Sequence, residues 1–210
     1  MKKINLVEIL LAISSFLLVI SFSIKIAINF KAIYYKDITY LNIEQDNNMK
    51  YEEIKQNYDN LIEYLVSDER ELELPSFKTS ENGRIHFEEV KNIIKIFNNI
   101  FYISLFITIV LNIIFKKNYI FLLINSILLV VVPFIILLFV YINYDFAFDL
   151  FHKIFFNNDF WIFDPGYDPV INILPQNYFL HELLFILFII LISSLISLLI
   201  YFFRKKKVNR

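Results

Sequence analysis

The stretch YIFLLINSILLVVVPFIILLFVY, from Tyr119 to Tyr141, runs for twenty-three residues without a charged side chain. At about 1.5 Å per residue, a helix of this length crosses the roughly 30 Å hydrocarbon core of a bilayer. Pro133 lies near its middle and is expected to kink the helix. Two lysines precede the stretch, and a segment rich in acids and aromatic rings follows it. The stretch therefore predicts a membrane-spanning helix whose two ends meet different environments.

Three further apolar runs, at about 9–28, 96–115 and 183–203, are also long enough to span a membrane. The composition agrees, because 58% of the 210 residues are hydrophobic and only two are glycine. The first run is interpreted as an uncleaved anchor and not a signal peptide, since no small-residue cleavage site follows it. Glu8 and Lys25, near the two edges of this run, are expected to snorkel toward the membrane surfaces.

Basic residues without any acid among them flank the spans on one side. Two lysines precede the first span, Lys116 and Lys117 separate the second from the third, and five basic residues follow the fourth. The positive-inside rule assigns these charges, and with them both chain termini, to the cytoplasmic side. The segments 29–95 and 142–182 hold twenty of the twenty-one acidic residues and are expected outside the cytoplasm.

These observations predict an all-α membrane protein, in which a four-transmembrane-helix bundle carries a small extracytoplasmic cap formed by the 1–2 and 3–4 loops. The expected order is a first span with a cytoplasmic N-terminus (1–28), an outer segment (29–95), the second span (96–115), a cytoplasmic turn (116–118), the third span (119–141), an aromatic outer segment (142–182), the fourth span (183–203) and a basic cytoplasmic tail (204–210).

The first outer segment is expected to fold. KYEEIKQNYDNLIEYL, residues 50–65, places its apolar side chains at helical spacing and predicts an amphipathic helix. LELPSF, residues 72–77, predicts a short extended piece that ends at Pro75. TSENG, residues 79–83, predicts a turn in which Gly83 adopts a positive φ. RIHFEEVKNIIKIF, residues 84–97, predicts a helix that runs unbroken into the second span.

The second outer segment contains FDLFHKIFFNNDFWIFDP, residues 148–165, which is too charged to cross a bilayer and unusually aromatic. Asp149 and His152 are three residues apart and share a face if the segment is helical. Repeated turn signals follow. Because aromatic side chains favour the headgroup boundary, we expect this segment to lie in the membrane interface and to roof the bundle.

The chain has three histidines, and all lie in or beside the outer segments. Glu89 and Asp149 stand three residues from His86 and His152 respectively, so each carboxylate could fix a tautomer or hold an imidazolium. His181 has only an adjacent carboxylate, which a helix would turn away from it, and is interpreted as structural. A metal site built from the three histidines stays open as an alternative.

Several other chemistries lack a motif. The chain has no cysteine, so a thiolate nucleophile, ligand or redox centre is excluded. It has no HExxH, no GxSxG and no glycine-rich phosphate loop. The acidity of the outer segments argues against a nucleic-acid partner. No cofactor is implied.

The run FHKIFFNNDFWIFDPGYDPVINILPQNYF, residues 151–179, resembles the bacterial lipoprotein intramolecular transacylases, as do NLIEYL, LPSF and GRIHFEEVKNI upstream. The four-span layout is also shared, so the resemblance covers most of the chain. It implies a cell-membrane acyltransferase with four helices under an extracellular cap. It also implies two catalytic histidines where cap meets membrane, which by motif are His86 and His152.

The resemblance implies diacylglyceryl-modified lipoproteins as substrates, embedded in membrane lipid. The sn-2 acyl chain would move to the α-amino group of the N-terminal cysteine and leave a lyso-form lipoprotein. Nucleophile and ester belong to one molecule, so no serine or cysteine nucleophile is needed. Attack closes an eight-membered ring, which an aromatic enclosure could hold folded. Two histidines, with ordinary pKa values of about 6.5, suit the proton transfers.

On this reading Glu89 and Asp149 support the two histidines, and the expected substrate contacts come from Phe151, Phe155, Phe156, Asn158 and Trp161. Trp161 could instead simply anchor the cap at the headgroup boundary. The alternatives are another lipid- or lipoprotein-directed acyltransferase on this scaffold, and a non-enzymatic lipid-binding or sensing module. The sequence leaves open which histidine is the base, the oxyanion stabiliser, the acyl-chain preference and the oligomeric state.

Overall fold

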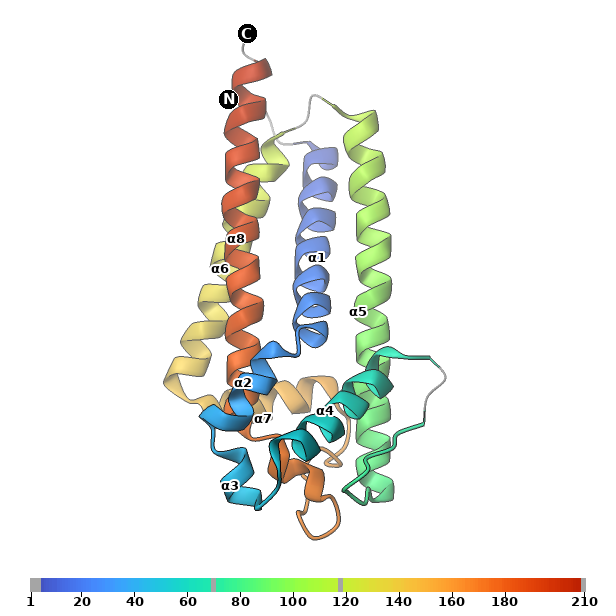
Figure 1. Cartoon of the computed structure of the whole chain (residues 1–210). Coiled ribbons are helices and arrows are strands. Elements are labelled where there is room, and N and C mark those ends of the chain that lie inside the picture. The colour runs from blue at the N-terminus through green and yellow to red at the C-terminus, as the bar shows by residue number, and fades with distance from the viewer. Residues whose placement is uncertain (1–4, 69–70, 117–118, 209–210) are drawn as a thin grey trace. The chain divides into compact units, whose positions relative to one another are not determined.

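The computed structural model describes residues 5–68, 71–116 and 119–208, and within these ranges every regular element is helical (Figure 1). The α-helices are α1 (Leu6–Asn29), α2 (Ala32–Tyr40), α3 (Ile43–Asn47), α4 (Tyr51–Val66), α5 (Glu81–Ile114), α6 (Ile120–Ile142), α7 (Tyr144–Phe155) and α8 (Gln176–Val208), with one 3-10 turn, η1 (Pro169–Ile173). Four of them, α1, α5, α6 and α8, are long and apolar enough to span a membrane. The predicted all-α, four-span fold class is confirmed.

The chain divides into two compact units. The first comprises residues 1–25, 97–144 and 185–210 and is called the bundle unit. The second comprises residues 26–96 and 145–184 and is called the loop unit, because it contains most of the two long segments between spans. Helices α1, α5 and α8 contribute to both units.

The bundle unit presents apolar side chains outward and holds its helices together with small polar ones. Phe106 and Phe134 are more than half exposed, as expected of surfaces that face lipid chains. Between helices, the Ser194 hydroxyl donates to the carbonyl of Ser126 at 2.8 Å. Such short polar side chains let helix backbones approach closely and bond across the interface. Pro133 is buried inside α6, which continues through it.

Glu8 differs from the expectation that it snorkels. Its side chain is fully buried, and its Oε2 accepts the backbone N–H of Phe121 at 2.7 Å. That N–H belongs to the first turn of α6, whose leading N–H groups have no partner within the helix. The carboxylate is therefore drawn inward because it caps α6 and complements the positive end of the helix dipole.

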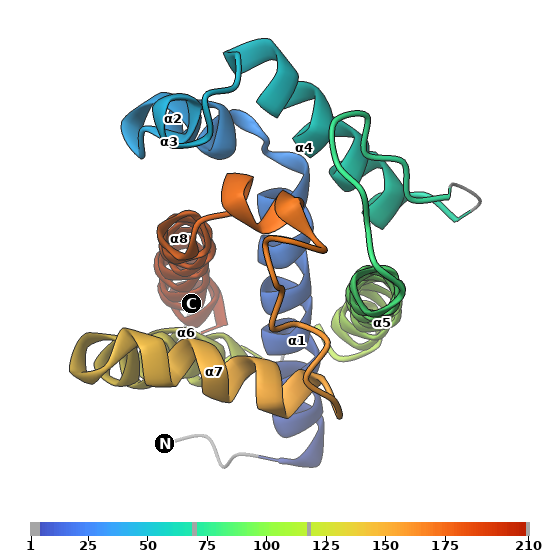
Figure 2. The same cartoon turned by 90° about the horizontal axis from the view of Figure 1, so that it is seen from below.

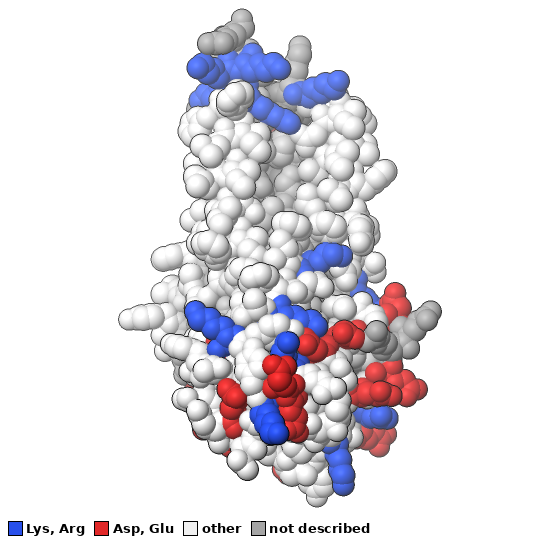
Figure 3. Space-filling view, viewed as in Figure 1, with Lys and Arg blue, Asp and Glu red and all other residues white. Residues whose placement is uncertain are grey.

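Basic side chains gather on the bundle unit where α8 ends, and a broad uncharged surface adjoins them (Figure 3). The visible face of the loop unit carries acidic and basic side chains together. Glu8 is the one acid in the sequence of the bundle unit. The charge asymmetry predicted from the sequence therefore follows the division into two units.

The loop unit has its own core, built around three tyrosines. The rings of Tyr34 and Tyr58 stack at 3.7 Å between centroids, and Tyr178 meets both edge-on. The hydroxyls of Tyr58 and Tyr178 are 2.8 Å apart, and that of Tyr34 donates to the Ile173 carbonyl. Burial raises the pKa of Tyr34 and Tyr58, so both hydroxyls remain protonated. These contacts join α2, α4, η1 and the start of α8.

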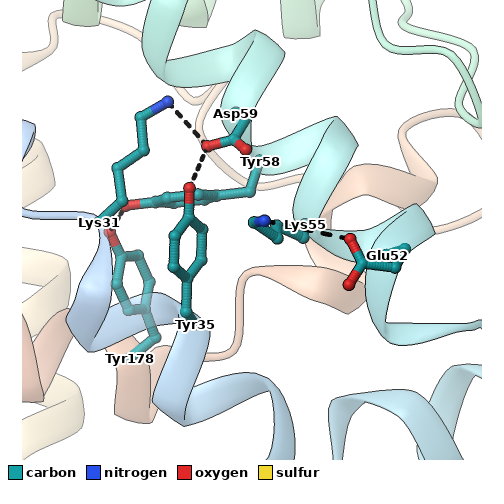
Figure 4. A network of polar contacts seen from close by, with 7 residues as sticks. All are labelled: Lys31, Tyr35, Glu52, Lys55, Tyr58, Asp59 and Tyr178. Atoms are coloured by element: carbon teal, nitrogen blue, oxygen red, sulfur yellow. Dashed lines mark hydrogen bonds and ion pairs between the residues drawn. The ribbon is translucent and has the colours of Figure 1, made fainter.

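The predicted amphipathic helix is confirmed as α4. Ile54, Leu61 and Leu65 are buried against the tyrosine core. At the rim of the same core, Asp59 accepts hydrogen bonds from Lys31 at 2.7 Å and from Tyr35 at 2.6 Å (Figure 4). The helix thus has one apolar face in the core and an anchored polar edge.

The start of α5 corrects the predicted TSENG turn. The described glycines have no positive φ, and Gly83 lies inside α5, which begins at Glu81. The Asp168 carboxylate accepts the backbone N–H of Ser80 at 2.7 Å and its hydroxyl at 2.6 Å, while the Ser80 hydroxyl accepts the N–H of Gly83. A Cβ at position 83 would overlap Asp168. Glycine is needed at position 83 because Asp168 approaches its backbone closely. Ser80 acts as the N-cap, so the helix starts earlier than predicted.

Two short helices, α2 and α3, were not predicted from the sequence. Asn42 and Asn48, with φ of 56° and 49°, bound α3 in the left-handed region that asparagine tolerates. The predicted unbroken helix from residue 84 into the second span is confirmed by α5. After α7, the chain crosses the loop unit through turns and η1 to reach α8 (Figure 2).

Candidate active site

His86 lies in the second turn of α5, inside the loop unit, and is 7% exposed. Its ring is surrounded by aromatic side chains, with centroid distances of 4.6 Å to Phe156, 5.3 Å to Phe163 and 5.8 Å to Phe87. Its Nδ1 is buried and has no hydrogen-bond partner among the described residues. This environment favours a neutral imidazole with one ring nitrogen available to a ligand.

His152 lies in the last turn of α7 and is half-buried. Its Nδ1 is 2.8 Å from the carbonyl oxygen of Phe148. Because a carbonyl only accepts, the contact places the ring proton on Nδ1 and leaves the lone pair on Nε2. Burial lowers the pKa of His152, while the Phe148 hydrogen bond and the charge of Asp149 act in the opposite direction. The ring is therefore neutral at pH 7, with Nε2 able to accept a proton.

The two histidines come together although they lie 66 positions apart in the sequence. Their ring centroids are 6.3 Å apart. Phe156 is buried and contacts both rings, at 4.6 Å from His86 and 5.7 Å from His152. One small functional group can therefore reach both imidazoles.

Trp161 covers the other histidine ring. Its indole stacks on His152 with centroids 4.4 Å apart and an angle of 21° between the rings. The indole Nε1 is buried and has no acceptor in the part of the chain that the structure describes. Phe148 packs on the same imidazole at 4.3 Å. His152 is thus held between aromatic rings, next to an N–H group that has no partner.

Glu89 and Asn158 join α5 to the loop that follows α7. The Asn158 amide donates to Glu89 Oε1 at 2.7 Å, and its Oδ1 accepts the backbone N–H of Phe160 at 3.0 Å. Glu89 Oε2 is buried without a partner among the described side chains and backbone groups. No hydrogen bond joins Glu89 to His86 within the described ranges. The geometry therefore shows Glu89 holding Asn158, and not the imidazole that it was expected to support.

Asp149 is exposed, and the backbone carbonyl of Phe148 is the group that fixes the tautomer of His152. Asp149 influences that ring only through space, by raising its pKa. Phe151 and Phe155 contact each other in a tilted arrangement, with ring centroids 4.8 Å apart, and are 51% and 41% exposed. Phe151 also meets His152 at 5.3 Å. These two rings lie at the outer edge of the cluster, whereas Phe156 and Trp161 form its interior.

α7 leaves a further apolar surface exposed. Phe146 is 56% exposed and Ile154 is 68% exposed, on a helix that has no fully buried residue. A helix with an uncovered apolar face beside charged residues is suited to lie in a membrane interface. The candidate site is thus built partly from an element with the character of an interfacial helix.

His181 takes part in a different cluster. Its Nδ1 is 2.8 and 2.9 Å from the two carboxylate oxygens of Asp37, which is 3% exposed. The pair joins the start of α8 to α2. Among the described residues no group of three or more His, Cys, Asp or Glu side chains has the arrangement of a metal site. His181 was expected to be structural, and its partner lies 144 residues away in the sequence.

Two aromatic residues of the site were not predicted from the sequence. Phe163 packs on His86, and Phe148 packs on His152. Phe148 and His152 are four residues apart on α7, and this i,i+4 spacing brings the two rings together. Phe163 lies two residues after Trp161 in the same aromatic run. The aromatic density of this run was the available signal, but it does not indicate which rings turn inward.

Comparisons with known proteins agree on one family. The family model described as lipoprotein intramolecular transacylase Lit matches residues 9–179. The crystal structure of the membrane integral lipoprotein intramolecular transacylase Lit from Bacillus cereus superimposes with a TM-score of 0.93 at 37% identity, over 97% of this chain and 96% of that one. Variants of the same enzyme with one histidine replaced by arginine or by alanine match with TM-scores of 0.87, over 97% of this chain and 92% and 94% of theirs. No curated protein matches the sequence.

Proposed function

The chain belongs to the lipoprotein intramolecular transacylase family, and from this premise we propose that His86 and His152 are its catalytic residues. The protein is a multi-pass membrane acyltransferase. Its substrate is a lipoprotein whose N-terminal cysteine carries a diacylglyceryl thioether. The observation that carries the assignment is the pair of imidazoles, 6.3 Å apart and enclosed by aromatic rings.

The reaction is an isomerisation within one substrate molecule. The α-nitrogen of the cysteine attacks the carbonyl carbon of the sn-2 ester, so an amide bond forms and the bond to the glyceryl oxygen breaks. One proton leaves the nitrogen and one reaches the glyceryl oxygen. The product is an N-acylated lyso-form lipoprotein. No water, cofactor or second substrate enters the balance, so the protein supplies only orientation and proton transfer.

His152 is suited to be the base. The Phe148 carbonyl holds the proton on Nδ1, which leaves Nε2 free to accept one from the substrate amine. The resulting imidazolium is stabilised by that same carbonyl and by its position at the C-terminal end of α7, where the helix dipole favours a cation. The proton is then returned from Nε2 to the departing glyceryl oxygen.

His86 is suited to act as a neutral ring. It is buried among phenylalanines in the second turn of α5, and burial disfavours an imidazolium there. Its unpartnered Nδ1 can donate an N–H hydrogen bond to the glyceryl oxygen as the ester bond breaks. The two histidines therefore have different tasks, set by the groups that surround each ring.

The aromatic residues are suited to hold the substrate folded. Attack closes an eight-membered ring, which is improbable for a free flexible chain. Phe156 and Trp161 line the interior of the cluster, with Phe151, Phe155 and Asn158 around it. The Trp161 N–H, which lacks an acceptor, can donate to the ester oxygen as negative charge develops on it.

The orientation in the membrane follows from the charges. We assign both termini to the cytoplasm because basic residues flank the spans at those ends and follow α8. The loop unit, with its acids and the histidine pair, then lies outside the cytoplasm. This is the side of the bacterial cell membrane on which exported lipoproteins carry their acylated cysteine.

The test is acyl transfer by purified protein on a synthetic diacylglyceryl lipopeptide in detergent. The intact mass does not change, so the products are read by tandem mass spectrometry, which locates the acyl chain on the cysteine nitrogen. A second lipopeptide with isotope-labelled acyl chains, present in the same mixture, tests intramolecularity. We expect N-acylation without exchange of label. Unchanged fragment spectra would reject the proposed activity, and label exchange would reject its intramolecular course.

A further inference from the structure

Glu89 is a carboxylate with only one of its oxygens engaged. Oε1 accepts the Asn158 amide at 2.7 Å, while Oε2 is buried and has no partner in the described ranges. No ion pair of the described residues includes Glu89. A buried carboxylate oxygen without a donor is costly, because the water lost on burial is not replaced. Such an oxygen is suited to accept a hydrogen bond from a ligand.

The position of Glu89 ties it to the histidine pair. It stands three residues after His86 on α5, so the two side chains leave the same side of the helix. Its partner Asn158 lies on the loop that carries Trp161, and Trp161 stacks on His152. His86 therefore lies next to His152, His152 contacts Trp161, and the loop that carries Trp161 bonds back to Glu89.

We propose that Glu89 Oε2 binds the α-ammonium group of the substrate's N-terminal cysteine, an inference that rests on the proposed function. The reacting part of that substrate carries one cation, an α-ammonium with a pKa of about 8. A carboxylate and an ammonium form a charge-assisted hydrogen bond, which is among the strongest polar contacts in proteins. Glu89 thereby places the nitrogen beside the imidazoles before it is deprotonated.

This role is recognition and positioning, and it differs from that of a base. Pairing with a carboxylate stabilises the protonated amine, so it does not help the proton to leave. His152, with its free Nε2, remains the group that accepts that proton. Loss of the Glu89 charge should therefore raise KM by about 10- to 100-fold, as expected for a hydrogen bond to a charged group, and change kcat much less.

The experiment measures binding without turnover. The probe is a diacylglyceryl lipopeptide whose sn-2 ester is replaced by an ether, so that no acyl transfer takes place. A second probe is identical but lacks the α-amino group. We expect wild-type protein to bind the amine-bearing probe about 10- to 100-fold more tightly than the probe without it, and Glu89→Gln to reduce this preference to a few-fold.

Glutamine preserves the shape and the carbonyl oxygen that accepts from Asn158, so the loop contact is retained in the variant. Glu88→Gln is the matched control, because Glu88 is the preceding residue of α5 and is exposed. It should keep the full preference. Melting temperatures of the three proteins in the same detergent establish that each is folded.

Two results with the Glu89→Gln variant would overturn the ammonium site. One is unchanged binding of both probes, and the other is an equal weakening of both, which would assign Glu89 to loop structure alone. Neither probe reacts, so binding is independent of the acyl-transfer assay. Preference without turnover in the wild type would contradict the proposed function but support the site, and turnover without preference would contradict the site alone.

Discussion

His152 owes its tautomer to a backbone atom, and His86 owes its neutrality to the phenylalanines around it. We expect His86→Ala and His152→Ala each to lower acyl transfer by at least 10²-fold, because each removes a ring that handles a proton or the departing oxygen. Tandem mass spectrometry of the lipopeptide product measures the rate. The melting temperature of each variant should stay near that of wild type, since neither ring belongs to the tyrosine core. Activity within a few-fold of wild type would remove that histidine from the mechanism.

Asp149 allows the charge state of His152 to be tested. Burial lowers the pKa of His152 below its ordinary value of 6.5, so the neutral base persists to a lower pH and activity is lost only as the pH falls through that lowered pKa. The charge of Asp149 raises the same pKa. Asp149→Asn should therefore move the acid limb of the pH profile of kcat to lower pH and leave the plateau unchanged. A shift to higher pH, or a collapse of the plateau, would contradict this account.

Trp161 combines a stacked ring with an unpartnered N–H, and two substitutions distinguish the contribution of the ring from that of the N–H. Trp161→Ala removes both and should reduce kcat by about 10²-fold or more. Trp161→Phe keeps an aromatic ring against His152 but lacks the N–H. We expect it to lose a similar factor if the N–H stabilises the oxyanion, with a melting temperature close to wild type. Loss of stability at a normal rate per folded molecule would instead make Trp161 an anchor.

At the scale of elements, the Asp37–His181 pair joins α2 to the start of α8. His181→Ala leaves a nearly buried carboxylate without this partner, which should lower the free energy of unfolding by about 1–3 kcal/mol. The acyl-transfer rate per folded molecule should change little, because His181 lies in a different cluster from His86 and His152. Thermal melting and rate measurements on one preparation test both statements. A rate loss as large as that of His152→Ala would place His181 in the mechanism.

The start of α5 determines where His86 lies. The helix begins at Glu81 because Asp168, from the turns after α7, caps it through Ser80. The same contact leaves no room for a side chain at Gly83. The two long segments between spans are therefore joined fewer than two turns before the first histidine, and the second segment supplies the other histidine. This capping of the α5 N-terminus by Asp168 is thus a structural reason why two distant parts of the sequence share one site.

For the whole molecule, orientation in the membrane is the property to test. The chain has no cysteine, so single cysteines can be introduced without background. Asn172→Cys, at an exposed position of the loop unit, should react with a membrane-impermeant maleimide in intact bacteria. Lys206→Cys, at the exposed end of α8, should react only after the membrane is permeabilised. The reverse pattern would place the histidine pair on the cytoplasmic side.

The sequence by itself determined the membrane class, the four spans, the amphipathic helix α4 and the unbroken helix α5. Each depends on a local pattern: the length of an apolar run, or apolar side chains spaced by one turn. The resemblance of residues 151–179 to a known family also depends on contiguous residues, and it directed attention to His86 and His152. A pattern within one stretch of chain contains enough information for conclusions of this kind.

Only the tertiary structure decided which groups meet. Asp37 pairs with His181 across 144 positions, Asp168 caps α5 across 88, and Asn158 bonds to Glu89 across 69. Glu8 and Gly83 were misjudged for the same reason, since the partner that draws in the first and crowds the second comes from elsewhere in the chain. Hydrogen bonding and close packing depend on positions in space. A carboxylate left half-satisfied beside a histidine can be found only once every potential partner has been placed.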